Sequence, residues 1–174
     1  GERFDLYVAD GDSSNILSPV ASVCSSGRPE DADPLYQNPR LIRMQFEERF
    51  VKPLRRSVES LLVRSEAPTS PILESVRAAA LASFGAVVRL QFTLISDHVQ
   101  HSALNSHFRG EVNFEELARR PAWRDLQANL RGAKVNAIYL LRSTAKRPNG
   151  QPIQDRGHQL FWEKAFRASG AGDI

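Results

Sequence analysis

The stretch VVRLQFTLI, residues 87–95, decides the fold, and Ser96 and Asp97 follow it directly. Its apolar residues are nearly continuous and are interrupted only by Arg89, Gln91 and Thr93. A run of this kind is typical of a strand that is buried, or nearly so, on both faces of a parallel sheet. Ligands of open α/β sheets bind beyond the carboxyl ends of the strands. Ser96 and Asp97 are therefore predicted to lie on the ligand-facing edge of the sheet.

Helical and strand patterns alternate on both sides of this segment. Ser70 and Pro71 form a cap and first turn, and the apolar spacing that follows predicts a helix ending near Gly85. After the strand come a polar loop over residues 96–110, a capping box at Asn113 and a short helix over 121–130. Residues 135–141 read as the next strand and 153–169 as the last helix. This order predicts an α/β fold, a three-layer sandwich with a largely parallel central sheet.

The first third of the chain predicts a hairpin and a long helix. Residues 4–9 and 20–24 read as strands that pair across a turn-rich segment, and 25–38 as a long loop. Asn38 is a plausible N-cap with Pro39 in the first turn. Pro53 should kink the helix or divide it, because proline removes an amide donor. The apolar residues of the helix recur at three- and four-residue steps: Ile42, Phe46, Phe50, Leu54, Val58, Leu61 and Leu62.

Composition indicates one ordinary globular domain over residues 1–174. The chain is 41% hydrophobic and 25% charged, and it contains no apolar run long enough to span a bilayer. Residues 1–5 do not resemble a signal peptide, so the cytoplasm is the expected compartment. A periplasmic or membrane-tethered location is the alternative if an upstream segment has been removed. The single cysteine, Cys24, excludes an internal disulfide and is predicted to be a small buried side chain.

The charge pattern disfavours nucleic acid as the partner. The net charge is only +3, and the arginines of the long helix, such as Arg49 and Arg55, are interleaved with acids such as Glu48 and Glu59. This pattern is typical of a solvated helix face, whereas a nucleic-acid surface is a more concentrated patch. A nucleic-acid-associated protein remains an alternative that would rely on Arg142, Lys146 and Arg147.

Several short motifs resemble a known family. The element order, the Thr-Ser-Pro helix start and the strand ending in Ser-Asp resemble a von Willebrand factor A domain that is entered after its first strand. The resemblance implies a Rossmann-like sandwich and a non-enzymatic protein-interaction module of a bacterial complex, whose partner protein it does not identify. The motifs that resemble a group of poorly characterised bacterial A-like proteins are Asn38-Pro39-Arg40, Ser70-Pro71-Ile72, the segment from Ser96 to Ser102, and Phe161-Trp162.

The resemblance also implies where a metal would bind. In that family an Asp-x-Ser-x-Ser loop, a threonine and an aspartate hold the ion, and here Thr69 matches the threonine and Asp97 the aspartate. The segment from Asp10 to Ser14 reads Asp-x-Asp-x-Ser, and a plain turn is favoured because a strand follows it. The domain is therefore predicted to be N-terminally incomplete. Without its first strand the sheet has an exposed edge, which an upstream segment or another chain must cover.

Thr69, Ser70, Ser96 and Asp97 are accordingly predicted to form partner-binding loops or a degenerate metal site. Magnesium at Thr69 and Asp97 is the weaker interpretation, because two ligands are too few for tight binding. In the favoured interpretation Thr69 and Ser70 cap a helix, and Asp97 accepts loop amides.

No complete catalytic constellation is visible, so the chain is predicted not to be an enzyme. His98, His101 and His107 share one loop with Asp97, and a zinc site or a hydrolase acting through the loop from His98 to His107 is the alternative. Solvated loop histidines are the favoured interpretation, with His158 a surface or packing residue. Neither a phosphate-binding glycine loop nor a nucleophile elbow is present. Trp123, Phe161 and Trp162 are expected to pack in the core.

Overall fold

A computed structural model describes residues 2–9, 19–25, 27–33, 36–61, 67–83, 90–110 and 112–174. The chain forms two compact units. Unit 1 comprises Gly1–Val8 and Ser18–Glu66, and unit 2 comprises Ala9–Leu17 and Ala67–Ile174. The turn predicted from Asp10 to Ser14 lies outside the described residues. That residues 1–174 make one domain stays a prediction.

Unit 1 contains the predicted hairpin. Strands β1 (Arg3–Leu6) and β2 (Ala21–Cys24) pair antiparallel, with Arg3 opposite Cys24 and Leu6 opposite Ala21. Side chains alternate between the two faces of a strand, and Cys24 falls with Ser22 on the exposed face of β2. Cys24 is therefore an exposed free thiol, and the prediction that it is buried was wrong.

The long helix of unit 1 follows a short 3-10 turn at Pro29–Asp31. It consists of α1 (Pro39–Phe46), a wider π turn over Glu47–Val51 and α2 (Lys52–Leu61). Asn38 caps it as predicted, since its side chain accepts hydrogen bonds from the amides of Arg40 and Leu41. The irregularity expected from Pro53 takes the form of the π turn just before it, where the Lys52 amide donates to the carbonyl of Glu47.

The apolar face of this helix packs against the hairpin of the same unit. Phe50 stacks on Phe46 with ring centroids 5.0 Å apart, and it meets Phe4 of β1 edge-on at 6.4 Å. Unit 1 is thus held together by aromatic contacts between helix and hairpin.

Unit 2 is an α/β arrangement with a small parallel sheet. The predicted α/β class and the parallel pairing are confirmed. Strands β3 (Gln91–Ser96) and β4 (Lys134–Tyr139) pair in parallel, with Gln91 beside Lys134 and Ser96 beside Tyr139. Within the described part of unit 2 they are the only strands. Its helices are α3 (Ile72–Ala82), α4 (Phe114–Arg119), α5 (Trp123–Leu126) and α6 (Arg156–Ala168).

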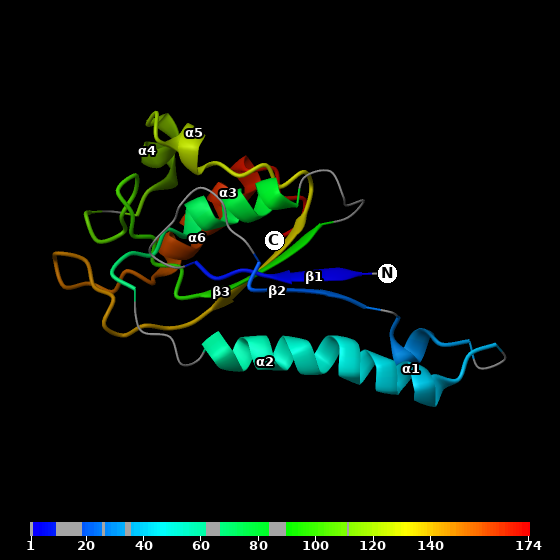
Figure 1. Ribbon diagram of the computed structural model, residues 1–174. Coiled ribbons are helices and arrows are strands. Elements are labelled where there is room, and N and C mark those ends of the chain that lie inside the picture. The colour runs from blue at the N-terminus through cyan, green and yellow to red at the C-terminus, as the bar shows by residue number, and fades with distance from the viewer. Residues whose placement is uncertain are drawn as a thin grey trace. The chain divides into compact units, whose positions relative to one another are not determined.

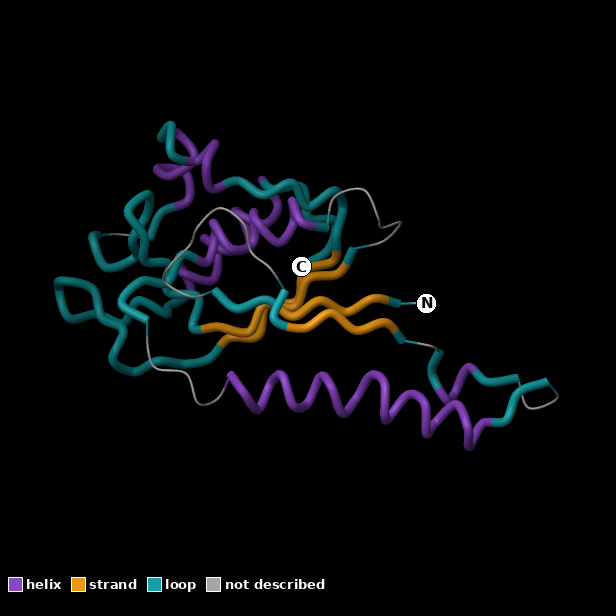
Figure 2. Tube along the Cα trace, viewed as in Figure 1, coloured by secondary structure: helices purple, strands orange, loops and turns teal. Residues whose placement is uncertain are grey.

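The core of unit 2 lies between the sheet and helices α3 and α6. Figures 1 and 2 show both helices on the same side of β3 and β4. Trp123, Phe161 and Trp162 are buried in this core, which confirms their predicted packing role. Phe92 and Leu94 of β3 and Val135 of β4 face the helices from the sheet.

The opposite face of the sheet exposes apolar side chains at its carboxyl end. Ile95 and Ile138 are register partners and are 62% and 47% exposed. In β3 the exposed Gln91, Thr93 and Ile95 alternate with half-buried residues, because the described helices of unit 2 pack on the other face. The prediction of a strand buried on both faces was therefore wrong for residues 91–95; residues 87–89 lie outside the described part.

Two helices differ from their predicted bounds. Helix α5 is one turn long, and a non-helical segment from Gln127 to Leu130 replaces the rest of the predicted 121–130 helix. Helix α6 begins three residues later than predicted, after its N-cap Asp155. None of the helices in the described residues has the length and apolar character needed to cross a bilayer.

Candidate functional site

The carboxyl ends of β3 and β4 bring the predicted loop residues to one edge of the sheet. Ser96 is the last residue of β3, and its carbonyl accepts a hydrogen bond of 2.9 Å from the amide of Leu140, just after β4. The two strands thus remain paired up to the point where each continues into a loop. Asp97 and Leu140 begin these loops side by side.

Asp97 joins the two loops through several hydrogen bonds. Its Oδ1 accepts from the Val99 amide at 2.9 Å, which confirms the prediction that Asp97 accepts loop amides. Its Oδ2 lies 3.4 Å from Nη1 of Arg142, in the loop after β4. The Gln154 side-chain amide donates to the carbonyls of both Asp97 and Leu140 at 2.8 Å. The hydrogen bonds at Asp97 therefore hold the loop after β3 against the loop after β4.

Ser70 is held by backbone pairing. Its amide donates to the His101 carbonyl at 2.8 Å, and the His101 amide donates back to the Ser70 carbonyl at 2.9 Å. Helix α3 follows Pro71 without a side-chain cap at that position, so the prediction that Ser70 caps it was wrong. Gln100 supplies the acceptor instead, since its Oε1 accepts from the Leu73 amide at 3.0 Å.

A hollow of about 360 Å³ lies where these loops meet. Thr69 and Ser70 line it directly. Ser96 and Asp97 do not line it, but Asp97 holds Arg142, which does. The structure therefore brings two of the four predicted residues to the hollow and connects a third through an arginine. The complete lining is Ala67, Pro68, Thr69, Ser70, Val99, His101, Phe108 and Arg142.

The donor set at Asp97 does not suit a magnesium ion. The Arg142 guanidinium already supplies a positive charge beside the carboxylate, and the Val99 amide occupies the other oxygen. Magnesium prefers several oxygen ligands in octahedral geometry. Within the ranges that the structure describes, no three His, Cys, Asp or Glu side chains converge on one point. Both carboxylate oxygens of Asp97 thus already have partners within the protein.

Three histidines are buried beneath this edge, and the sequence analysis did not predict this burial for the two that lie in the loop. His98, His107 and His158 are 0%, 2% and 0% exposed, so the prediction of solvated loop histidines was wrong for His98 and His107. Only His101 is half-buried. The three rings, together with Tyr139 of β4 and Trp162 of α6, are called the histidine network below. The apolar neighbour Val99 and the spacing of His158 and Trp162 by one helical turn are the sequence signals of this burial.

Hydrogen bonds connect the histidine network across three segments of unit 2. The Tyr139 hydroxyl lies 2.6 Å from Nδ1 of His158, and Nε2 of His158 lies 3.0 Å from both the His98 carbonyl and Nδ1 of His107. The Trp162 indole also donates to the His98 carbonyl, at 2.8 Å. The network thus ties the loop after β3 to β4 and α6.

The partners of the network define its tautomers. A carbonyl only accepts, so Nε2 of His158 carries the proton and its Nδ1 accepts from the Tyr139 hydroxyl. Nδ1 of His107 accepts from the Gln100 amide at 3.3 Å, so this nitrogen is unprotonated. Burial is the main cause that lowers the pKa of His98, His107 and His158, that of His158 to about 4. Burial also raises the pKa of Tyr139, so the network is uncharged near neutral pH.

The loop holding these histidines also contains a serine–histidine contact. Nδ1 of His101 lies 2.8 Å from Oγ of Ser106, and His101 lines the hollow. This distance suits a nucleophile and a base. The same Ser106 oxygen accepts from the Phe108 amide at 3.3 Å, so the contact also serves the fold of the loop.

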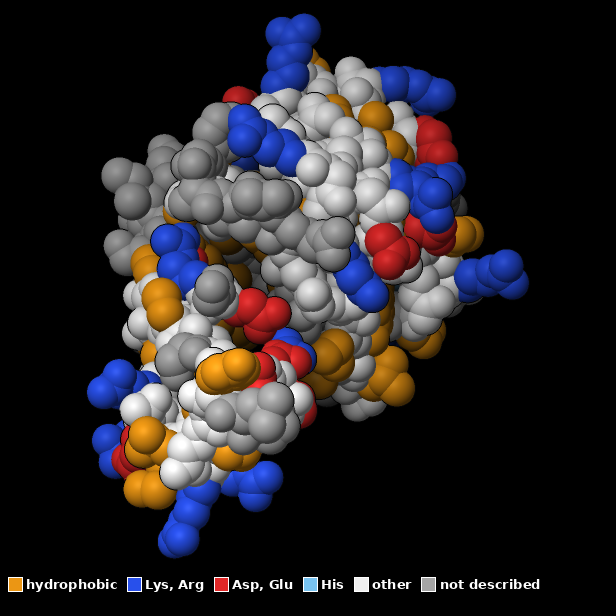
Figure 3. Space-filling view, turned by 90° about the vertical axis from the view of Figure 1, so that its right-hand side faces the viewer, with side chains coloured by type: hydrophobic (Ala, Val, Ile, Leu, Met, Phe, Trp, Pro, Cys, Tyr) orange, Lys and Arg blue, Asp and Glu red, His pale blue; other side chains and the backbone are white. Residues whose placement is uncertain are grey.

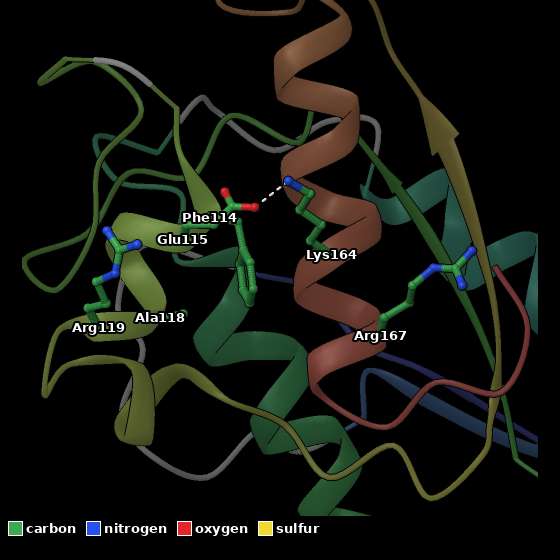
Figure 4. A pocket seen from close by; sticks show the side chains of 6 residues that line it. All are labelled: Phe114, Glu115, Ala118, Arg119, Lys164 and Arg167. Atoms are coloured by element: carbon green, nitrogen blue, oxygen red, sulfur yellow. Dashed lines mark hydrogen bonds and ion pairs between the residues drawn. The ribbon is translucent and has the colours of Figure 1, made fainter.

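A second hollow, of about 520 Å³, lies between α4 and α6 (Figure 4). Phe114 and Ala118 contribute its apolar lining. Figure 4 shows Glu115 and Lys164 pointing toward one another, where they form an exposed ion pair, while Arg119 and Arg167 point away. Exposed ion pairs contribute little stability. This hollow presents no converging polar groups and is the weaker candidate.

Charge does not concentrate into a single patch on the face that Figure 3 presents. Lysine and arginine side chains there are spread among acidic and uncharged ones.

No protein-family model, curated protein or solved structure matches this chain. The functional argument therefore rests on the geometry of the site.

Proposed function

We propose that this chain is a non-enzymatic protein-interaction module of a bacterial complex, with a von Willebrand factor A-like three-layer architecture. It binds a partner protein through the loops at the carboxyl ends of β3 and β4, and it does so without a metal. Thr69 and Ser70 line the binding hollow, while Ser96 and Asp97 position the loops around it.

The exposed apolar side chains at this edge carry the proposal. Leu141 is 86% exposed and Leu140 52% exposed, immediately before Arg142 of the hollow. Ile95 and Ile138 continue this apolar surface along the outer face of the sheet. Contiguous exposed apolar side chains mark interaction sites in soluble proteins, and arginine is enriched in their centres.

The three-layer architecture gives these side chains a second role. A parallel sheet is normally covered on both faces. In the proposed architecture the partner that binds Leu140 and Leu141 extends over this face of the sheet and covers Ile95 and Ile138 as the third layer.

Photo-crosslinking tests the proposed interface. A photo-crosslinking amino acid in place of Leu141 should yield an adduct of defined mass with one partner in cells of the native host. The matched control is Leu160, a leucine of α6 that is 41% exposed and does not line the hollow. Adducts of equal yield from both positions, or none from position 141, would contradict the proposal.

The metal-free form predicts that divalent cations leave the protein unchanged. Because Arg142 already neutralises Asp97, millimolar magnesium or manganese should not raise the melting temperature of the wild-type chain. Differential scanning calorimetry with and without the ion measures this. A clear rise that disappears in Asp97→Ala would show that the loops do hold a metal.

A hydrolase is the second candidate, and the contact between Ser106 and His101 favours it. A fluorophosphonate probe labels an activated serine. Labelling of the wild type that is lost in both Ser106→Ala and His101→Gln would establish this function. The interaction module predicts no labelling above that of the unfolded chain.

A further inference from the structure

The histidine network lies directly beneath the candidate site and is connected to it by the loop of residues 98–107. Val99 and His101 of this loop line the hollow. His101 pairs with Ser70, and Gln100 reaches Leu73 at the start of α3. Any change in the loop therefore changes the wall of the hollow.

Two contacts of the network depend on a neutral imidazole: that of the Tyr139 hydroxyl with Nδ1 of His158, and that of His158 with Nδ1 of His107. The Nε2 proton of His158 is shared between the His98 carbonyl and Nδ1 of His107, each 3.0 Å away. A proton added to His107 Nδ1 would face both the His158 N–H and the Gln100 N–H, because that nitrogen accepts from Gln100. The His98 carbonyl could still accept from His158 and Gln100, but the new N–H of His107 would face two other N–H groups without an acceptor of its own, and the added charge would be buried.

The charged groups around the network do not offset this cost. Besides burial, a charged His158 and Arg147 both disfavour a charge on His107, whose ring packs edge-on against Phe161. Asp155 at the start of α6 and Asp97 after β3 favour a charge on His158, but burial outweighs them. On the α3 side, Glu74 is held by the Gln100 side-chain amide at 2.8 Å.

We propose that the histidine network is an acid-sensitive latch: protonation of His107 and His158 releases the loop of residues 98–107 and opens the wall of the hollow while the rest of unit 2 stays folded. The loop is suited to such a release because it is held to unit 2 through the His98 carbonyl, the Gln100 side chain and the paired Ser70. Opening this loop exposes the buried side chains of Val99, Gln100 and His107, but it exposes less surface than unfolding the core and therefore costs less free energy.

Native-state hydrogen exchange on the full chain tests the latch. The reporters are the amides of Gln100, His101 and His107, each hydrogen-bonded within the loop or to Ser70. After correction for intrinsic rates, their opening constant should rise about tenfold per pH unit for each histidine as the pH falls below 6.5 toward 4. Their exchange should also be nearly independent of low urea, because local opening exposes little surface.

Amides in the second half of α6, such as those of Ala165 and Phe166, serve as the reference. They should exchange more slowly at every pH and should show the full urea dependence of global unfolding. The latch is refuted if the loop amides share the protection and urea dependence of α6, or if loop opening does not increase in acid.

His107→Asn removes the titrating ring but can keep the hydrogen bond that supports the fold of the loop. Its side-chain oxygen can accept from the Gln100 amide near the position of Nδ1, but it takes no proton, so the pH slope of loop opening should fall by one proton. The matched control is His101→Asn in the same loop, whose ring contacts Ser106 and Phe108 rather than the network, and whose slope should stay as in the wild type. An unchanged slope in His107→Asn would refute the latch.

An NMR titration of the wild-type imidazoles covers the case in which His107→Asn fails to fold. His107 and His158 should remain neutral at pH 5.5, and titration of either ring above pH 6.5 would overturn the proposal. The consequence for partner binding rests on the function proposed above. If loop opening is observed in acid but the photo-crosslinking residue at position 141 gives no adduct, the acid-sensitive latch is supported and the proposed interaction site is contradicted.

Discussion

At the scale of single residues, Gln100 connects the loop to helix α3. It is fully buried, and its side-chain oxygen accepts from the Leu73 amide while its nitrogen donates to Glu74 and Ser102. The sequence did not reveal this role, because Ser70 before Pro71 is the stronger local pattern for a cap. The backbone of Ser70 is committed to pairing with His101, which leaves the first turn of α3 to a residue that lies far away in sequence.

Gln100→Ala should lower the free energy of unfolding by about 2–4 kcal/mol. The change leaves the buried Leu73 amide without an acceptor and creates a cavity. Urea denaturation followed by circular dichroism measures the effect. Gln159→Ala, at an exposed position of α6, is the matched control and should stay within about 0.5 kcal/mol of the wild type. Equal effects at the two positions would contradict the capping role.

At the scale of secondary structure, local patterns predicted most elements and tertiary contacts set the rest. The Asn38 cap, the Asn113 cap, the hairpin and the parallel strands follow from residue preferences and periodicity. The burial of His98 and His107 does not, because it depends on rings from β4 and α6 that pack around them. The candidate site was predicted only in part for the same reason, because tertiary contacts that no local pattern reveals bring Arg142 and His101 to the hollow.

Asp155 shows how a cap fixes the orientation of α6. Its side chain accepts from the His158 amide at 2.9 Å and from Arg147 at 2.8 Å. Burial raises the pKa of this carboxyl, but the His158 amide and Arg147 outweigh it, so the pKa lies below its ordinary value. The cap therefore stays ionised near neutral pH and holds the first turn that carries His158.

Asp155→Ala should lower the free energy of unfolding by about 1–2 kcal/mol, since it removes an N-cap. Asp155→Asn should recover part of this loss, because asparagine caps equally well but loses the charged, partly buried pairing with Arg147. Thermal and urea unfolding of both variants measure the difference. Equal losses in the two variants would assign the effect to the ion pair.

At the scale of the whole molecule, the buried histidines make stability depend on pH. In the unfolded chain their ordinary pKa is 6.5, whereas burial lowers the pKa of all three in the folded chain. Below pH 6.5 the unfolded state therefore binds more protons than the folded state. The stability is complete above pH 6.5 and is lost as the pH falls toward the folded pKa, about 4 for His158.

The free energy of unfolding should accordingly fall by up to about 1.4 kcal/mol per pH unit for each histidine between pH 6.5 and 5. Urea titrations at half-unit pH intervals measure this slope. Replacing His101, the half-buried histidine outside the network, with asparagine should leave the slope unchanged. A stability that is flat over this range would show that the three rings are accessible to protons in the folded state.

The exposed thiol of Cys24 and the two buried tryptophans have a practical consequence. Cys24 is the chain's single cysteine and belongs to unit 1, whereas Trp123 and Trp162 are its two tryptophans and belong to unit 2. A maleimide dye on Cys24 would report on unit 1, and tryptophan emission would report on unit 2. The unmutated chain therefore carries two independent optical reporters, and the unfolding of each unit can be recorded separately in one sample.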